Sequence, residues 1–135
     1  PTEAEWEYGA RGGSSKAFAN GDIADLGCGK DGKLSKAAWY CGTAGERTHA
    51  VGQKEPNAWG LYDMHGNVWE WCRDWYGAYP FGDVMDAKGP SDGKYRISRG
   101  GSWYDGAGLC RSPYRGRFSP GRRNGDLGFR LVKSL

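Results

Sequence analysis

Residues 99–130 read RGGSWYDGAGLCRSPYRGRFSPGRRNGDLGFR, and this stretch decides how the rest of the chain is interpreted. It begins with the compact turn Arg99–Trp103 and ends in the apolar run Leu127–Val132, which we expect to form a strand. The residues between are rich in Gly, Arg, Tyr and Ser and show no helical or strand period. Such a segment cannot bury an apolar face of its own, so we expect an ordered loop system displayed by a rigid scaffold.

A short helix is predicted at the start of the chain. Thr2 and Glu5 form a capping box, in which each side chain accepts a hydrogen bond from the other residue's backbone N–H. Trp6 and Ala10 follow at helical spacing, and Gly12-Gly13 ends the helix. We expect this helix to pack on a sheet.

The densest pattern outside the C-terminal part is PNAWGLYDMHGNVWEWC, residues 56–72. Residues 67–72 alternate as in a strand, with Trp69 and Trp71 on one face and Glu70 on the other. The two tryptophans make a strong packing anchor.

Glu70 is the unusual residue of that strand, because a buried carboxylate needs a cation or an arginine. Two alternatives stay open. Glu70 could form an ion pair with Arg130 or Arg99, or it could be an oxygen ligand of a hard cation such as calcium.

The remaining segments predict short strands separated by long loops. Ala37–Tyr40 is expected to be a buried anchor, His49–Gly52 an extended piece and Tyr95–Arg99 a strand, whereas Asp74–Lys94 is expected to be a loop. No internal repeat or linker divides the chain, so we predict a single α+β domain over residues 1–135 with small antiparallel sheets.

Four cysteines bear on the compartment and on metal binding. Cys28 and Cys41 bracket a polar, Gly-rich loop, so a local disulfide is a prediction there. The even count permits two disulfides without requiring an oxidising compartment, and the compartment stays open, with surface display or an extracellular setting favoured. Zinc is disfavoured, because there is no C-x-x-C pair and His49 and His65 are isolated.

Composition and charge exclude several classes of protein. The 135 residues include 24 Gly, 7 Trp and 8 Tyr, which is too aromatic for disorder. No run of eighteen apolar residues exists that would span a membrane. The net charge is only +3, but basic residues crowd one stretch, and no nucleic-acid motif accompanies them, so nucleic-acid binding is disfavoured. The basic residues of that stretch are Arg111, Arg115, Arg117, Arg122 and Arg123.

The motifs together resemble those of the formylglycine-generating enzyme (sulfatase-modifying factor) family. They are, in order, PTEAEWEYGARGG, PNAWGLYDMHGNVWEWCRDWYG, RGGSW, CRS and GFRL. The resemblance covers the whole chain and is weakest between Lys16 and Lys36. It implies a C-type-lectin-like fold with one or two helices and high loop content. Members normally carry a further N-terminal portion before the first helix, so a minimal version, a truncated chain and the accessory half of a larger protein are all expectations.

Resemblance to the family does not by itself imply catalysis. Its oxidases use two cysteines after the GGS(Y/W) turn to bind copper, and the first would fall near Asp105, which is not a cysteine. The second belongs to an insertion that this chain lacks. Cys110 is then expected to be a disulfide partner of Cys72 or a small core residue. Soft-metal chemistry needs both sulfurs, so the missing pair counts against copper-dependent oxidation. A copper-dependent oxidase or a related thiol-acting enzyme is therefore the second hypothesis.

A narrower resemblance is to the variable proteins of diversity-generating retroelements, which diversify residues between GGSW and GFRL on a fixed lectin-like scaffold. It implies a non-enzymatic module that binds a protein or other macromolecular ligand. The matching positions are Tyr104, Asp105, Gly106, Gly108, Leu109, Tyr114, Gly116, Phe118, Arg122, Asn124, Gly125 and Asp126.

The residue types of this loop agree with a binding surface, because Tyr offers contact area at low entropy cost and small polar residues adapt. The expected anchors are Tyr104, Tyr114, Phe118, Arg122 and Arg123. We expect that replacing the three aromatic anchors would abolish binding and leave thermal stability nearly unchanged.

The family resemblance also implies a calcium site in the GNVWEW segment. The matching ligands are the backbone of His65, Gly66 and Val68 and the side chain of Glu70. No other cofactor is required by this interpretation.

Overall fold

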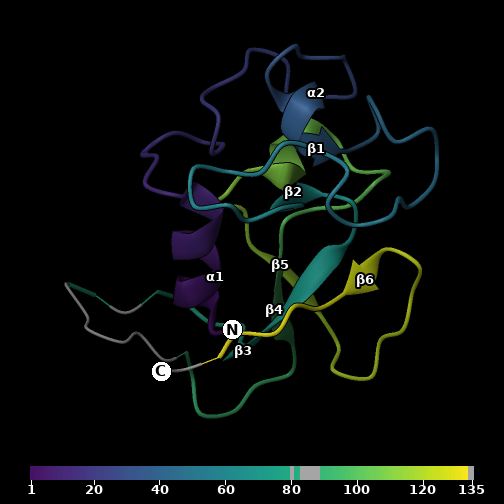
Figure 1. Ribbon diagram of the computed structural model, residues 1–135. Coiled ribbons are helices and arrows are strands. Elements are labelled where there is room, and N and C mark those ends of the chain that lie inside the picture. Colours follow the sequence, from purple (N-terminus) through teal and green to yellow (C-terminus); the bar gives the residue numbers. More distant parts are fainter. Residues whose placement is uncertain (80, 83–88, 134–135) are drawn as a thin grey trace.

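The computed structural model describes residues 1–79, 81–82 and 89–133. A four-stranded sheet and the first helix occupy the lower half of the molecule in Figure 1, and a loop-rich part with two very short strands lies above them. The elements are α1 (Glu3–Arg11), α2 (Leu34–Ala37), β1 (Ala38–Trp39), β2 (His65–Gly66), β3 (Trp69–Trp75), β4 (Arg96–Arg99), the 3₁₀ helix η1 (Ala107–Cys110), β5 (Gly116–Phe118) and β6 (Leu127–Gly128).

Helix α1 forms as its sequence predicts. The Thr2 side chain accepts a hydrogen bond from the Glu5 backbone N–H, and the Glu5 side chain accepts one from the Thr2 backbone N–H. Gly12 ends the helix in the left-handed conformation. The buried face of α1 presents Trp6 and Ala10 to a core cluster that also contains Met64, Cys72 and Ile97. The prediction of a short helix packed on a sheet is therefore confirmed.

The main sheet has the strand order β5-β4-β3-β6. β3 pairs with β4 and β4 with β5 in antiparallel fashion, as expected, and a bulge interrupts β3 between Trp71 and Trp75. β6 pairs with β3 in parallel, which was not expected, and only Leu127 and Gly128 take part. The longer strand predicted to Val132 is wrong, because the chain leaves β3 after Gly128 and loses its hydrogen-bonding neighbour.

The upper part is held by a small parallel pair, β1 with β2, and by its own core. That core consists of Phe18, Leu34, Ala38, Tyr40, Ala107 and Cys110. The predicted disulfide joins Cys28 to Cys41 and closes the polar loop, and the buried anchor at Ala38 and Tyr40 is confirmed.

The extended piece predicted at His49–Gly52 is not a strand. The His49 ring instead stacks on Trp39, with ring centroids 3.7 Å apart, and its backbone N–H donates to the Asn67 side chain. These contacts hold residues 49–52 in place without the backbone pairing of a β-sheet. No helix in the described part of the chain has the length and apolarity to cross a membrane.

Candidate ligand-binding surface

The segment 99–126 divides into two arms. We call residues 99–112 the buried arm and residues 113–126 the exposed arm. Most of the buried arm is inaccessible to solvent, including Gly101, Ser102, Ala107 and Cys110, whereas Ser119–Gly125 is exposed throughout. The buried arm therefore supports the predicted display loop, and residues 119–125 form its exposed surface.

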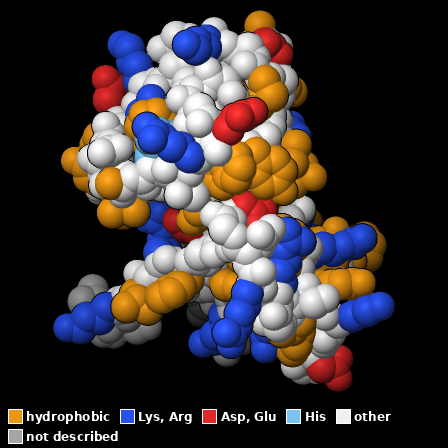
Figure 2. Space-filling view, turned by 90° about the vertical axis from the view of Figure 1, so that its right-hand side faces the viewer, with side chains coloured by type: hydrophobic (Ala, Val, Ile, Leu, Met, Phe, Trp, Pro, Cys, Tyr) orange, Lys and Arg blue, Asp and Glu red, His pale blue; other side chains and the backbone are white. Residues whose placement is uncertain are grey.

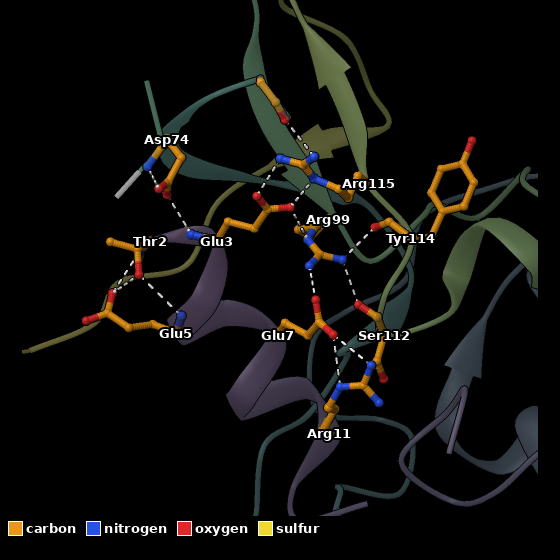
Figure 3. A network of polar contacts seen from close by, with 12 residues as sticks. Thr2, Glu3, Glu5, Glu7, Arg11, Asp74, Arg99, Ser112, Tyr114 and Arg115 are labelled. Atoms are coloured by element: carbon orange, nitrogen blue, oxygen red, sulfur yellow. Dashed lines mark hydrogen bonds and ion pairs between the residues drawn. The ribbon is translucent and has the colours of Figure 1, made fainter. Parts of the chain in front are cut away.

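Arg99 ties the buried arm to helix α1. Its side chain is fully buried, and Nη1 donates to the carbonyls of Ser112 at 2.7 Å and Tyr114 at 2.8 Å. Its Nη2 pairs with Glu7, and its Nε lies 3.1 Å from Oε1 of Glu3, close enough for an ion pair although the angle makes no hydrogen bond. Figure 3 shows this guanidinium between the two helix carboxylates and the loop carbonyls.

Arg115 makes the second connection between the loop and α1. Its Nε and Nη2 donate to the two oxygens of Glu3 at 2.7 and 2.8 Å, and its Nη1 donates to the Gly77 carbonyl at 2.8 Å. Such a bidentate pair fixes the orientation of both side chains. Glu3 thus shares one carboxylate between Arg99 and Arg115 (Figure 3).

Asp105 anchors the turn after Trp103 rather than facing solvent. It accepts hydrogen bonds from Trp69 Nε1 at 2.8 Å and from Ser102 Oγ at 2.5 Å. Burial raises the pKa of this carboxyl group, and the two hydrogen bonds offset part of that rise. Asp126 is also buried, and its carbonyl accepts from the Trp69 backbone at 2.7 Å.

Between the arms lies a depression of about 450 Å³. Its residues come from both arms, from β3 and β5 and from the segment after β3. They are Trp69, Tyr76, Tyr104, Asp105, Leu109, Tyr114, Arg115, Gly116, Arg117 and Phe118.

The depression brings together about half of the sequence-predicted ligand positions. Those that line it are Tyr104, Asp105, Leu109, Tyr114, Gly116 and Phe118. Four further predicted positions are exposed in the loop that follows β5, namely Arg122, Arg123, Asn124 and Gly125.

Three predicted positions do not offer a contact surface. Gly108 is buried and its N–H donates to the Leu26 carbonyl, and Gly106 lies against the same loop, where a Cβ would meet Leu26 O at 3.1 Å. Asp126 is only 2% exposed. Leu26 and Gly27, which directly precede Cys28, cover the two glycines, and the contribution of these glycines is structural.

The aromatic anchors are more firmly packed than the sequence suggested. The Phe118 ring lies 6.0 Å from Trp69 and 6.1 Å from Trp71, and the Tyr114 ring lies 5.9 Å from Trp69. Only Tyr104 is half exposed. We therefore revise the expectation that all three rings could be removed without loss of stability, because two of them contact the tryptophans of β3.

Sequence reasoning did not place Tyr76, Arg115 and Arg117 in the site. The Arg117 guanidinium lies over the Tyr76 ring, 4.6 Å from its centroid. Both arginines belong to the basic stretch, and that was the available clue. Tyr76 lies about forty positions earlier in a predicted loop, and nothing local connects it to this surface.

The predicted disulfide between Cys72 and Cys110 is wrong, and the alternative of a small core residue holds. Both thiols are free and buried, and they belong to different core clusters. Burial raises the pKa of Cys72 to about 12 and also raises that of Cys110. Neither thiol forms a thiolate at neutral pH, and no group of three or more His, Cys, Asp or Glu in the described part of the chain could hold a metal.

Glu70 forms the ion pair that was one of its two alternatives. Arg130 donates to both carboxylate oxygens, at 2.5 and 2.7 Å, and Trp6 Nε1 donates at 2.6 Å. Arg99, the other partner considered, binds Glu3 and Glu7 instead. A calcium ion at Glu70 would have to compete with this guanidinium. Calcium binding by Glu70 and the backbone of His65, Gly66 and Val68 stays a prediction.

Comparison with known proteins places this geometry in a family. All of residues 1–135 match the family described as "Sulfatase-modifying factor enzyme 1-like domain". The chain belongs to this family. Its sequence is 39% identical to the protein named "Serine/threonine-protein kinase pkn1" of Chlamydia pneumoniae, over 100% of this chain and 21% of that protein. It is 37% identical to the formylglycine-generating enzyme of Streptomyces coelicolor, over 98% of this chain and 45% of the enzyme.

One solved structure is similar to this chain over most of its length. "Treponema denticola variable protein 1" superposes with a TM-score of 0.85 and 43% identity, covering 96% of this chain and 45% of that one. The C-type-lectin-like α+β fold expected of the family is thus confirmed. The chain spans between about a fifth and a half of the lengths of these relatives.

Proposed function

We propose that this domain is a non-enzymatic binding module, in which a lectin-like scaffold presents the depression and the exposed arm to a protein or other macromolecular ligand. The observation that carries the proposal is the division of the segment 99–126. The buried arm is fixed by contacts to α1 and β3, and both arms contribute aromatic side chains, with two arginines from the exposed arm, to an open depression in the same segment as the exposed residues 119–125.

The likeness to a variable protein supports the same proposal. A scaffold that fixes its loop through backbone carbonyls and glycines leaves the outward side chains free to change. We propose accordingly that copies of the gene in one genome differ at the codons of the exposed positions, such as Tyr104, Arg122 and Asn124, and not at those of Arg99 or Asp105.

The oxidase hypothesis has weaker support, although relatives named as formylglycine-generating enzymes match most of the chain. Asp105 occupies the position at which the resemblance implies the first copper-binding cysteine, and it is held by Trp69 and Ser102. The core cluster that contains Cys110 holds no second free thiol, and burial keeps both free thiols protonated. A pair of sulfurs for a soft metal is therefore not assembled in this loop.

The proposal is tested by selecting a random twelve-residue peptide library on the immobilised domain. We expect selected peptides to lose binding to a Tyr104→Ser/Arg123→Ser variant and to keep it for Val51→Ser, since Val51 is exposed elsewhere on the molecule. Peptides that bind both variants equally, or a library that yields no binder, would contradict the proposal.

A further inference from the structure

Strand β5 is an edge of the main sheet within the candidate surface. Only β4 pairs with it, so the other side of its backbone has no strand partner among the described residues. β5 covers Gly116–Phe118, and its residues line the depression. An open strand edge presents N–H and C=O groups to which an extended chain can add as a further strand.

The two faces of β5 differ in chemistry. Ile97 lies opposite Arg117 and Arg96 opposite Phe118, so the two β5 side chains leave opposite faces of the sheet. Arg117 stacks on Tyr76, and Phe118 contacts Trp69. A strand added beside β5 would meet a guanidinium on one face and aromatic rings on the other. The complementary strand alternates acidic and apolar residues.

The charge of the surface points to the same ligand. Residues 104–126 contain five arginines and two aspartates, and both aspartates are buried. Within the described part of the chain, the guanidinium groups of Arg117 and Arg123 make no hydrogen bond or ion pair. That of Arg122 lies 3.7 Å from Asp126 and over the Phe118 ring, 4.2 Å from its centroid. Figure 2 shows Lys and Arg side chains interspersed with hydrophobic ones across the lower half of the face that carries β6.

We propose, resting on the function proposed above, that the ligand is an extended acidic peptide segment that adds to β5 as a strand. Backbone hydrogen bonds to β5 supply the register, and Arg117, Arg122 and Arg123 select acidic side chains. The competing explanation is that a short, arginine-bearing edge protects the sheet from self-association.

The test uses defined peptides and fluorescence anisotropy. The probe is a labelled decapeptide of five Glu-Val repeats. Its two comparison peptides are five Lys-Val repeats and the Glu-Val peptide with every valine amide N-methylated, which keeps the charge and removes the donors of one strand edge. We expect the first peptide to bind at least tenfold more tightly than either of the others.

Variants of the domain locate the binding site. Arg117→Glu/Arg123→Glu is expected to weaken binding of the Glu-Val peptide at least tenfold. Lys30→Glu/Arg47→Glu is the matched control, because it changes the net charge equally at exposed positions outside the surface and should leave binding within twofold. Thermal melts establish that both variants are folded.

Three outcomes would overturn the inference. The N-methylated peptide could bind as well as its parent, the Lys-Val peptide could bind equally, or a heparin oligosaccharide could bind more tightly than the peptide with the same dependence on arginine. Library peptides that need Tyr104 and Arg123 but are neither acidic nor sensitive to N-methylation would refute this inference and leave the proposed function standing. Library peptides indifferent to this surface would refute both.

Discussion

The two arms of the segment 99–126 have similar compositions and very different surroundings. In the buried arm, Arg99 and Asp105 are enclosed, and Gly101 has a positive φ and would place a Cβ 2.6 Å from the sulfur of Cys110. In the exposed arm, a Cβ added at Gly121 or Gly125 would meet nothing. Glycine therefore serves close packing in the buried arm, whereas Gly121 and Gly125 lie in open surroundings. Gly116, at the start of the exposed arm, is still closely packed, because a Cβ there would lie 2.5 Å from Ser98 Oγ.

This difference separates what the fold needs from what a ligand could use. The buried arm is bound to α1 and β3 by backbone groups and by charges without access to water, so its residues are constrained by stability. In the exposed arm, residues 119–125 are exposed throughout, and most of their side chains can change at little cost. Three measurements can break or sharpen this contrast.

The largest effect is expected from removing the buried guanidinium. Arg99→Met leaves two helix carboxylates with fewer cations and two loop carbonyls without donors, and it should lower the free energy of unfolding by about 3–5 kcal/mol. Urea denaturation measures the change.

The matched control for this variant is Arg11→Met. Arg11 also pairs with Glu7 but is partly exposed, so its loss should cost about 1 kcal/mol or less. Equal losses for the two arginines would mean that the buried arm does not depend on Arg99.

The next effect depends on pH and concerns His65, which supports the buried arm. Its ring accepts from the Ala19 N–H at 3.0 Å and donates to the Cys110 carbonyl at 2.8 Å. Burial lowers the pKa of His65 from 6.5 to about 4. Above pH 6.5 the imidazole is neutral in both states. As the pH falls below 6.5 the unfolded chain takes up a proton that the folded chain refuses, so stability is lost.

Between pH 7 and pH 5 this linkage should reduce the free energy of unfolding by about 2 kcal/mol. Urea denaturation at the two pH values measures it, and His65→Gln, less stable at pH 7, should lose less of its remaining stability over the interval. An identical pH dependence in the two proteins would show that His65 does not carry the effect.

The smallest effect is expected in the exposed arm. Arg123→Ser/Asn124→Ser should change the free energy of unfolding by no more than about 0.5 kcal/mol, because these side chains are exposed. Phe118→Ala should cost about 2 kcal/mol, because its ring contacts two tryptophans. Thermal or urea melts compare them. A large loss in the double-serine variant would show that this loop of the exposed arm belongs to the folded core.

Much of the scaffold could be predicted because its patterns are local. The capping box and Gly12 define α1, alternation identifies β3 and β4, and the short spacing of Cys28 and Cys41 suggests their disulfide. The predictions that were wrong concerned contacts between segments distant in the chain. The length of β6 depends on where it leaves β3, and Cys72 and Cys110 could be paired on paper because the sequence does not say that they lie in different cores.

The sequence by itself determined that a glycine- and arginine-rich segment lies between a fixed turn and a closing strand, and that Glu70 needs a positive partner. Only the tertiary structure decided that Arg130 is that partner, that Arg99 serves the helix carboxylates, and that Asp105 and Asp126 are enclosed while Arg123 is not. The physical reason is that burial and charge pairing depend on neighbours distant in the chain, whereas caps, turns and alternation depend on residues a few positions apart.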